Sequence, residues 1–504
     1  MPDIKGFWTA ITDYESRPIA ALVADDADRA EQLVVDQSGI RFDFTKTHLD
    51  GELVERFVAL ADAADLDGAR KRLFGGEIVN PSENRAAEHT AERGEGSADS
   101  VARAKHLHLR MRALIDAIEA GALGEIRHIV HIGIGGSALG PDLVIDALHR
   151  VSDRYGVAVV SNVDGLALED AMLAFDPHYT LVAVASKTFT TTETMRNAAS
   201  ALEWLRAHGV EDPYGRFVAL TADPDKAIAW GIDETRVLPF SRNVGGRYSL
   251  WSSIGFPIAL ALGWDAFEEL LEGAAEIDRH FRLADWPRNA CALAAFADLY
   301  YAQVGCHATR AVFAYDERLR LLSSYLQQLE MESNGKRVTA DGKALDRPSA
   351  PIVWGGVGTD AQHAVFQLLH QGTHVVPVEF VASVAAGDGL DPDHHAMLLA
   401  NCFAQGAALM TGRANSDNLA GDYPGDRPST TILLDDVDAR TLGALIAFYE
   451  HRTFVHATLI GINPFDQFGV ELGKDIARSM GEGAEGIDAS TAGLMRAAGL
   501  STGG

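Results

Sequence analysis

The chain has few cysteines and a shortage of positive charge for its length. Its 504 residues include only 3 cysteines, and these lack the short paired spacing of a disulfide framework or a zinc knuckle. Lysine and arginine number 43 against 71 aspartates and glutamates, a formal net charge of −28. This balance argues against a general nucleic-acid binder, whose affinity comes from cationic contacts to phosphates, and it disfavours an anionic membrane surface as partner.

Long hydrophobic runs and targeting signals are also missing. No uninterrupted apolar stretch approaches the roughly 18 residues that a membrane span needs. The first residues show no basic region followed by an apolar region, as a secretory signal would. With 47% hydrophobic and 23% charged residues, the chain can bury large cores. We therefore expect a cytoplasmic protein in a reducing compartment.

Short β-branched runs alternate with longer amphipathic segments, a pattern typical of parallel sheets covered by helices. The first series of expected strands is 126–134, 157–163, 180–186 and 216–222. The second series is 310–315, 351–356, 374–381, 429–436 and 454–462. A helical stretch at 264–281 separates the two series, which favours two α/β domains over one large sheet.

The chain is accordingly divided into four parts. Residues 1–125 carry helical patterns and few strand runs, so we expect helices packed on the domains. The first α/β domain is predicted at 126–265 and the second at 290–470. The remaining residues, 471–504, are expected to form a helical tail.

Two glycine- or hydroxyl-rich loops directly follow expected strands of the first domain. GIGGSALG at 133–140 allows close approach of backbone to a ligand, and Ser137 adds a hydroxyl before a helix N-terminus that attracts anions. Gly133, Gly135 and Ala138 also fit the dinucleotide pattern GxGxxA. A tight turn between strand and helix is the plainer interpretation.

The second loop, SKTFTTTET at 186–194, crowds hydroxyl donors around Lys187 at an expected helix start. Small hydroxyls and backbone amides can enclose a phosphate monoester. An ordinary helix cap is the alternative, but a cap uses one hydroxyl rather than five. Two such loops in one domain favour phosphate as the ligand.

Further along the chain, several charged residues are candidates for acid–base chemistry. Arg247 follows two glycines in GGRYSLW and suits an oxyanion, although a surface charge is the common alternative. Glu332 precedes SNG, which is typical of a helix end, so its carboxylate could act as a general base rather than pair with Lys336. His370 stands at an expected helix end and could shuttle protons.

Two further patterns are less specific indications of chemistry. Gln467, Glu471 and Lys474 can share one helix face, either as a solvated surface or with Lys474 as a proton carrier in a cleft. His363, His370 and His374 form a loose set that lacks the HExxH arrangement of a zinc site.

The order of these motifs resembles the phosphoglucose isomerase family. The matching segments are GIGGS, SKTFTT, GGRYSLWS, QQxxMESNGK, QHAxxQLxHQGT and FDQxGVELGK, with GEIVNPSENRAAEH before them and ASTAGL after them. The resemblance runs from about residue 40 to about 497. It implies two sugar-isomerase (SIS-type) αβα sandwich domains with five-stranded parallel sheets in a homodimer.

The resemblance also implies roles for individual residues. The implied phosphate site is Ser137, Ser186, Lys187 (chiefly through its backbone), Thr188 and Thr191. Gly136 and Gln328 are expected to line the sugar site, with Gln467 near the ring. Glu332 corresponds to the catalytic base and Arg247 to the cation that stabilises the enediolate. His370, supplied by the neighbouring subunit, and Lys474 correspond to the ring-opening pair.

This sequence departs from the family pattern at a few positions. Ile78 replaces a lysine, Ala138 replaces an aspartate, and Asp360 and Ala361 change the usual GTNGQH. None of these positions is assigned to proton transfer, so the departures bear on loop and interface contacts rather than on the reaction.

The implied reaction is the interconversion of glucose 6-phosphate and fructose 6-phosphate, in glycolysis and gluconeogenesis, without metal or other cofactor. Two other functions compete with it. A non-catalytic sugar-phosphate sensor needs the loops but not Glu332, His370 and Lys474 together. A nicotinamide dehydrogenase needs an acidic ribose ligand, for which Asp164 is a candidate, but leaves the hydroxyls of 186–192 without a role.

Overall fold

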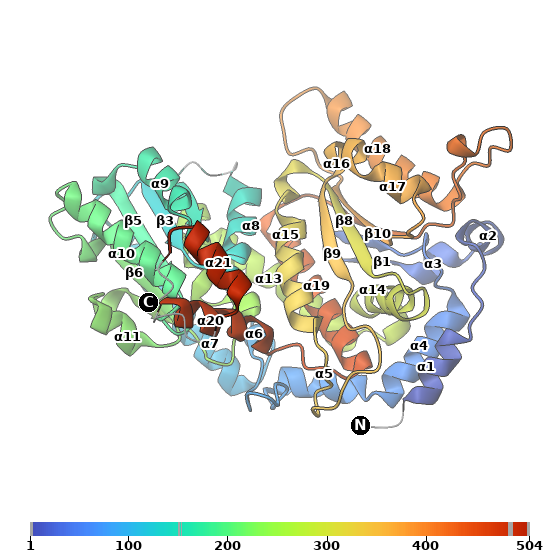
Figure 1. The fold of residues 1–504 in the computed structure, drawn as a ribbon, viewed down its shortest axis with the longest axis horizontal. Coiled ribbons are helices and arrows are strands. Elements are labelled where there is room, and N and C mark those ends of the chain that lie inside the picture. The colour runs from blue at the N-terminus through green and yellow to red at the C-terminus, as the bar shows by residue number, and fades with distance from the viewer. Residues whose placement is uncertain (1–3, 150–151, 153, 482–486, 501–504) are drawn as a thin grey trace. The chain divides into compact units, whose positions relative to one another are not determined.

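The computed structural model describes residues 4–149, 152, 154–481 and 487–500. The chain forms two compact units, residues 1–464 and 465–504, which are treated separately. The larger unit contains two β-sheets with helices on their faces, as Figure 1 shows. The predicted α/β class with parallel sheets is confirmed, whereas the domain boundaries stay predictions.

The first sheet has five strands, all parallel, in the order β4-β3-β5-β6-β7. Its strands are β3 (His128–Ile132), β4 (Gly156–Val160), β5 (Thr180–Ala185), β6 (Phe217–Thr221) and β7 (Val237–Pro239). Helices α9 (Gly165–Ala174), α10 (Thr192–Ala207) and α11 (Pro224–Trp230) pack on one face through a buried hydrophobic cluster. Because β3, β5 and β6 are buried on both faces, they read as continuous apolar runs.

The second sheet is mixed and has six strands, in the order β1-β2-β11-β10-β8-β9. Its strands are β1 (Val34–Gln37), β2 (Ile40–Asp43), β8 (Thr309–Tyr315), β9 (Ile352–Val357), β10 (Val378–Ser383) and β11 (Ser429–Leu434). The last four are parallel, while β2 runs antiparallel to β11. The expectation of a second five-stranded parallel sheet is therefore wrong.

The extra strands come from the N-terminal segment, which was expected to be helical. Strands β1 and β2 form a hairpin whose turn places Ser38 and Gly39 at positive φ. Four-residue strands are too short for a clear alternating pattern, which explains why they escaped prediction. The helices of this segment are α1 (Lys5–Thr12), α2 (Ile19–Asp25), α3 (Arg29–Leu33), α4 (Gly51–Ala63), α5 (Leu66–Gly75), α6 (His89–Glu92) and α7 (Ala98–Glu119).

The strand predicted at 454–462 is also wrong, because this run ends helix α19 (Ala439–Ile460). A capping box of Asp438 and Thr441 starts the helix, and Gly461 in the left-handed conformation ends it. The helix is buried almost all round, so its apolar residues show no helical periodicity. Periodicity alone cannot distinguish such a segment from a buried strand.

The remaining helices of the larger unit connect and cover the two sheets. They are α8 (Leu139–Leu148), α12 (Phe256–Leu262), α13 (Trp264–Leu283), α14 (Ala290–Leu299), α15 (Leu322–Leu326), α16 (Gly358–Ala364), α17 (Phe366–Gln371) and α18 (Pro392–Thr411). The smaller unit contains α20 (Glu471–Gly481) and α21 (Ala489–Ala497). No helix among the described residues is long and apolar enough to cross a membrane.

Helices α13 and α19 make the most extensive helix–helix contact of the larger unit. Two glycines allow this close approach. A Cβ added at Gly273 would lie 1.8 Å from the carbonyl oxygen of Arg440, and one at Gly443 would lie 2.0 Å from that of Leu270. The two backbones are therefore in contact at these positions.

We expect Gly443→Ala to destabilise the protein by about 3 kcal/mol, because overpacking against backbone outweighs the higher helix propensity of alanine. The matched control is Gly165→Ala, since an added Cβ there meets nothing within 4 Å. Thermal melting of both variants is the measurement. Equal melting temperatures for the two would contradict the close helix contact.

Candidate active site

The glycine-rich loop after β3 directly contacts the GGRYS segment, which contains Arg247. A Cβ added at Gly136 would lie 2.1 Å from the carbonyl carbon of Gly246 and 2.4 Å from the nitrogen of Arg247. The hydroxyl of Ser249 donates to the carbonyl oxygen of Gly136 at 3.3 Å. Only glycine fits at position 136, and the GIGGS loop and the GGRYS segment, far apart in sequence, form one surface.

A buried histidine on β3 holds the end of this loop. The Nε2 atom of His131 donates to the carbonyl oxygen of Ser137 at 2.7 Å. Burial lowers the pKa of His131 to about 4, so the ring is neutral near pH 7. Sequence reasoning missed this histidine because it lies inside an apolar strand.

The hydroxyl-rich loop leads from β5 into α10. The Oγ atoms of Ser186 and Thr191 lie 3.0 Å apart, and those of Thr188 and Thr190 lie 2.8 Å apart. The loop contains a residue at positive φ, Phe189. These hydroxyls are therefore gathered at the carboxyl end of β5, where parallel sheets bind ligands.

Lys187 adds positive charge beside this loop. Its Nζ donates to the carbonyl oxygen of Val244 at 2.9 Å, which connects the loop to the segment before Arg247. Burial, followed by the charge of Arg85, lowers the pKa of Lys187 to about 8. The charges of Arg247 and Arg242 contribute to this lower pKa, while Glu83 acts in the opposite direction. The cations that surround the loop create a local positive potential within an acidic protein.

Arg247 and Glu332 meet although they come from opposite halves of the larger unit. Arg247 follows the first sheet in a 3₁₀ segment, η6 (Gly246–Trp251), and Glu332 ends a π-helical turn, η11 (Gln327–Glu332), after β8. The Nη1 atom of Arg247 lies 3.0 Å from Oε1 of Glu332. The arginine is only 4% exposed, whereas the glutamate side chain keeps 22% of its surface accessible.

Gln328 completes this group. Its Nε2 atom donates to Oε2 of Glu332 at 2.7 Å, so each carboxylate oxygen has a donor. A Cβ added at Gly135 would lie 2.8 Å from that same nitrogen. The π-helical turn, a geometry often found at functional sites, thus places Gln328 and Glu332 beside the glycine-rich loop.

Lys336 does not exclude the role predicted for Glu332. Its Nζ donates to the main-chain carbonyl oxygen of Glu332 at 2.8 Å. The carboxylate oxygens themselves accept from Arg247 and Gln328. The carboxylate is thus held at the site, as its position before SNG had suggested.

His370 contacts residues of α17, of α18 and of the segment after α18. His370 is on α17, where its Nε2 atom lies 2.9 Å from Oε1 of Gln405 on α18, and its ring contacts Phe366 and Tyr423. These contacts involve neither Glu332 nor Arg247. No group of three or more histidine, cysteine or acidic residues able to hold a metal occurs in the described part of the chain.

Gln467 and Lys474 belong to the smaller unit. Lys474 lies on α20 and pairs with Glu471 at 3.0 Å. Gln467 precedes a 3₁₀ turn, η13 (Phe468–Val470), and its backbone is not helical, with φ −151° and ψ 45°. The prediction that Gln467 shares a helix face with Lys474 is therefore wrong. A change of backbone geometry ahead of α20 is the reason.

Asp164, the candidate ribose ligand of a dehydrogenase, caps a helix. Its Oδ1 accepts from the backbone nitrogen of Leu166 at the start of α9. This contact supports the plain interpretation of the GxGxxA match as a turn between strand and helix.

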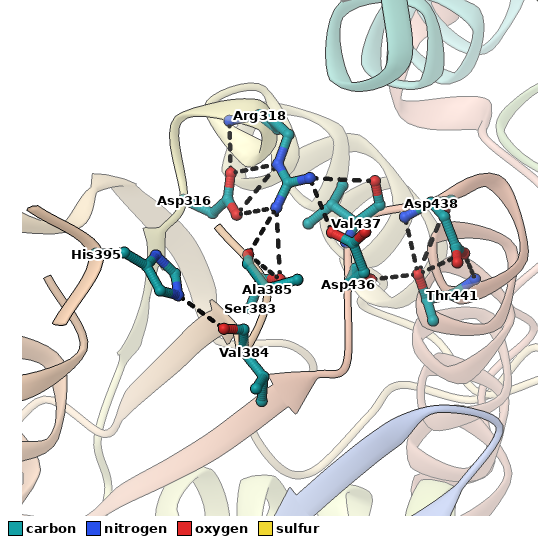
Figure 2. A network of polar contacts seen from close by, with 10 residues as sticks. All are labelled: Asp316, Arg318, Ser383, Val384, Ala385, His395, Asp436, Val437, Asp438 and Thr441. Carbon is teal, nitrogen blue, oxygen red and sulfur yellow. Dashed lines mark hydrogen bonds and ion pairs between the residues drawn. The ribbon is translucent and has the colours of Figure 1, made fainter. Parts of the chain in front are cut away.

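The carboxyl edge of the second sheet is filled by protein groups (Figure 2). Arg318 forms ion pairs with Asp316 after β8, at 2.8 Å, and with Asp436 after β11, at 2.9 Å. It also donates to the carbonyl oxygen of Ala385 after β10 at 3.3 Å. The guanidinium of Arg318 thus lies at the carboxyl edge of the second sheet. At the corresponding edge, the first sheet carries the glycine-rich and hydroxyl-rich loops.

Comparisons with known proteins agree with this arrangement. A family model described as phosphoglucose isomerase matches residues 43–495. A glucose-6-phosphate isomerase from Sphingopyxis alaskensis is 67% identical over 97% of this chain and 98% of that protein. The Zymomonas mobilis enzyme of the same name is 61% identical over 98% of both chains.

A solved structure extends the likeness to three dimensions. The crystal structure of a glucose-6-phosphate isomerase from Chlamydia trachomatis superposes with a TM-score of 0.87 at 29% identity, covering 98% of each chain. The family match spans the glycine-rich loop, the hydroxyl-rich loop, Arg247 and Glu332. The chain belongs to the phosphoglucose isomerase family.

Proposed function

We propose that this protein catalyses the reversible isomerisation of D-glucose 6-phosphate to D-fructose 6-phosphate, a step of glycolysis and gluconeogenesis. The observation that carries the proposal is the contact of Arg247 with Glu332 at 3.0 Å beside two loops suited to phosphate. Phosphorylated hexoses are charged and do not leave the cell readily, so we place the enzyme in the cytoplasm. The two relatives named above carry the same activity in their names.

The hydroxyl-rich loop is the proposed phosphate site. Ser137, Ser186, Thr188 and Thr191 supply hydroxyl donors, and Lys187 acts chiefly through its backbone. Because the ammonium group of Lys187 is held by Val244, it adds charge to the site without reaching into it. Such a site recognises the phosphate dianion in the substrate and in the product alike.

Glu332 is the proposed general base. In the open-chain aldose it removes the proton from C2, and the electron pair of the broken C–H bond forms the C1–C2 double bond of an enediolate. The negative charge collects on the oxygen at C1, where Arg247 stabilises it. The hydroxyl proton at C2 then passes to the oxygen at C1, and Glu332 returns the carbon-bound proton to C1. The oxygen at C2 becomes the carbonyl oxygen of the ketose, and no atoms are gained or lost.

Three further residues serve the sugar rather than the phosphate. Gly136 and Gln328 are proposed to line the sugar site, since Gln328 already binds the carboxylate of the base. Gln467, from the smaller unit, is proposed to contact the ring. These contacts orient C1 and C2 for a single base, as positioning requires.

Ring opening needs a second acid–base pair, for which we propose His370 and Lys474. His370 contacts Gln405 rather than the carboxylate of its own chain. We propose a homodimer in which His370 completes the site of the partner. The helices around His370 expose large apolar side chains, including Leu368, Met397 and Phe403, and a second copy would cover such surface.

Replacing the base tests the central assignment. We expect Glu332→Gln to fold normally and to lower kcat by about 10²–10⁴-fold or more, because the amide cannot accept the C2 proton. The control is Glu203→Gln, an exposed position on α10. A coupled assay without added metal or nucleotide in the isomerase step measures turnover. Near-normal kcat in Glu332→Gln would contradict the assignment.

Removing a loop hydroxyl tests the phosphate site. We expect Ser186→Ala and Thr191→Val each to raise KM about tenfold or more, since a hydrogen bond to a charged group contributes about 1.5–3 kcal/mol. Inhibition by inorganic phosphate should weaken in parallel. Ser200→Ala, on the following helix, is the control. Unchanged phosphate inhibition would place the phosphate elsewhere.

Mixing inactive subunits tests the shared site. A dimer of one Glu332→Gln and one His370→Ala chain contains one intact site only if His370 acts across the interface. Random exchange of equal amounts should then restore about a quarter of normal activity, since half of the dimers are mixed and each has one good site. No recovery after verified subunit exchange would contradict a histidine supplied by the partner.

The ring-opening roles have a separate test. His370→Ala and Lys474→Ala should slow conversion of the cyclic substrate more than that of an open-chain analogue, because the analogue bypasses ring opening. Stopped assays with both substrates give the comparison. Equal losses on both would argue for a role in the later proton transfer.

A further inference from the structure

Ser333 lies directly after the proposed base and touches the arginine that faces it. The Nε atom of Arg247 donates to Oγ of Ser333 at 2.6 Å. We propose that Ser333 is a positioning residue that holds the guanidinium of Arg247 in the orientation needed to stabilise the enediolate. This inference rests on the proposed isomerase function and adds a residue to it.

The guanidinium is fixed along three of its edges. Besides the bond from Nε to Ser333, Nη1 donates to Oε1 of Glu332 at 3.0 Å and Nη2 donates to the carbonyl oxygen of Pro464 at 2.5 Å. Because the group is planar and rigid, three acceptors in different directions fix both its plane and its rotation. Ser333 supplies the only one of these acceptors that is a neutral side chain.

The serine hydroxyl is itself held in place. Oγ of Ser333 lies 2.9 Å from the hydroxyl of Tyr248, and Ser333 is completely buried. The ring of Tyr248 packs on His89 with 4.7 Å between centroids. A buried hydroxyl with two fixed neighbours has little freedom to rotate, so its lone pair stays directed at Nε.

The π-helical turn that leads into Ser333 is held by a second arginine, Arg310. Two residues before the base, both carboxylate oxygens of Glu330 accept from Nη2 of Arg310, each at 2.5 Å. Arg310 is on β8 and also pairs with Glu379 on β10. The π-helical turn therefore directs Glu330 to the buried Arg310, while Glu332 and Ser333 contact Arg247.

This geometry has a chemical consequence. Without an acceptor for Nε, the guanidinium loses one of the three contacts that fix its rotation and can turn toward a fuller pairing with Glu332. A carboxylate that is more fully paired is a weaker base, and an arginine bound to it is a poorer donor to the oxygen at C1. Ser333 thus favours the contact through Nη1 over a fuller pairing of the two charges.

The variants Ser333→Ala and Ser333→Thr test the inference. We expect Ser333→Ala to lower kcat about tenfold to a hundredfold with little change in KM, as loss of one hydrogen bond to a charged group predicts. Threonine keeps the hydroxyl and should restore most of the activity. The control is Ser323→Ala, another buried serine in the same segment.

Two inhibitors separate positioning from a merely structural role. A five-carbon phosphosugar hydroxamate mimics the charged enediolate, whereas sorbitol 6-phosphate is an open-chain polyol without that charge. Ser333→Ala should bind the hydroxamate at least tenfold more weakly and bind sorbitol 6-phosphate as the wild type does. Equal weakening of both, or normal kcat, would overturn the inference.

If Ser333→Ala does not fold, Ser333→Cys carries the same prediction, because a thiol is a weaker acceptor of similar size. Its selective loss of hydroxamate affinity supports the inference, and unchanged hydroxamate affinity overturns it. Wild-type protein without isomerase activity would contradict the proposed function instead. An active wild type with unaffected Ser333 variants would contradict only the inference.

Discussion

The ion pair between Arg247 and Glu332, 3.0 Å long, joins the two halves of the larger unit at the proposed active site. Its partners come from the two halves of the larger unit, so both sheets must be placed before the pair can form. Gly136 is required because the glycine-rich loop packs against the backbone of Arg247. Arg93 forms buried ion pairs with Asp278 and Glu450. Glu450 also accepts a hydrogen bond from Trp251, which lies in η6 with Arg247, so this network supports the same segment.

Positive charge is concentrated locally, although the chain as a whole is acidic. A net charge of −28 disfavours an anionic ligand in general, but Lys187 lies among Arg85, Arg242 and Arg247. At the edge of the second sheet, by contrast, Arg318 is fully engaged by acidic partners (Figure 2). One sheet edge therefore gathers hydroxyl groups and cations, while the other is occupied by an arginine and its acidic partners.

Sequence reasoning found the loops and the charged residues because each follows a strand or stands in a motif. The supporting contacts of Ser333 and His131 could not be predicted from the sequence. A serine inside a motif and a histidine inside an apolar strand give no separate signal. The run at 454–462 failed for another reason: a helix buried all round has the composition of a strand. The hairpin β1–β2 was too short to register, although it extends the second sheet.

The most direct test of a single base between C1 and C2 uses glucose 6-phosphate carrying deuterium at C2, followed by NMR of the fructose 6-phosphate formed in water. Proton transfer through Glu332 predicts a primary isotope effect, with deuterium found partly at C1 and partly lost to solvent. Complete transfer to C1 without any solvent exchange, under all conditions of turnover, would indicate a hydride shift and contradict the account.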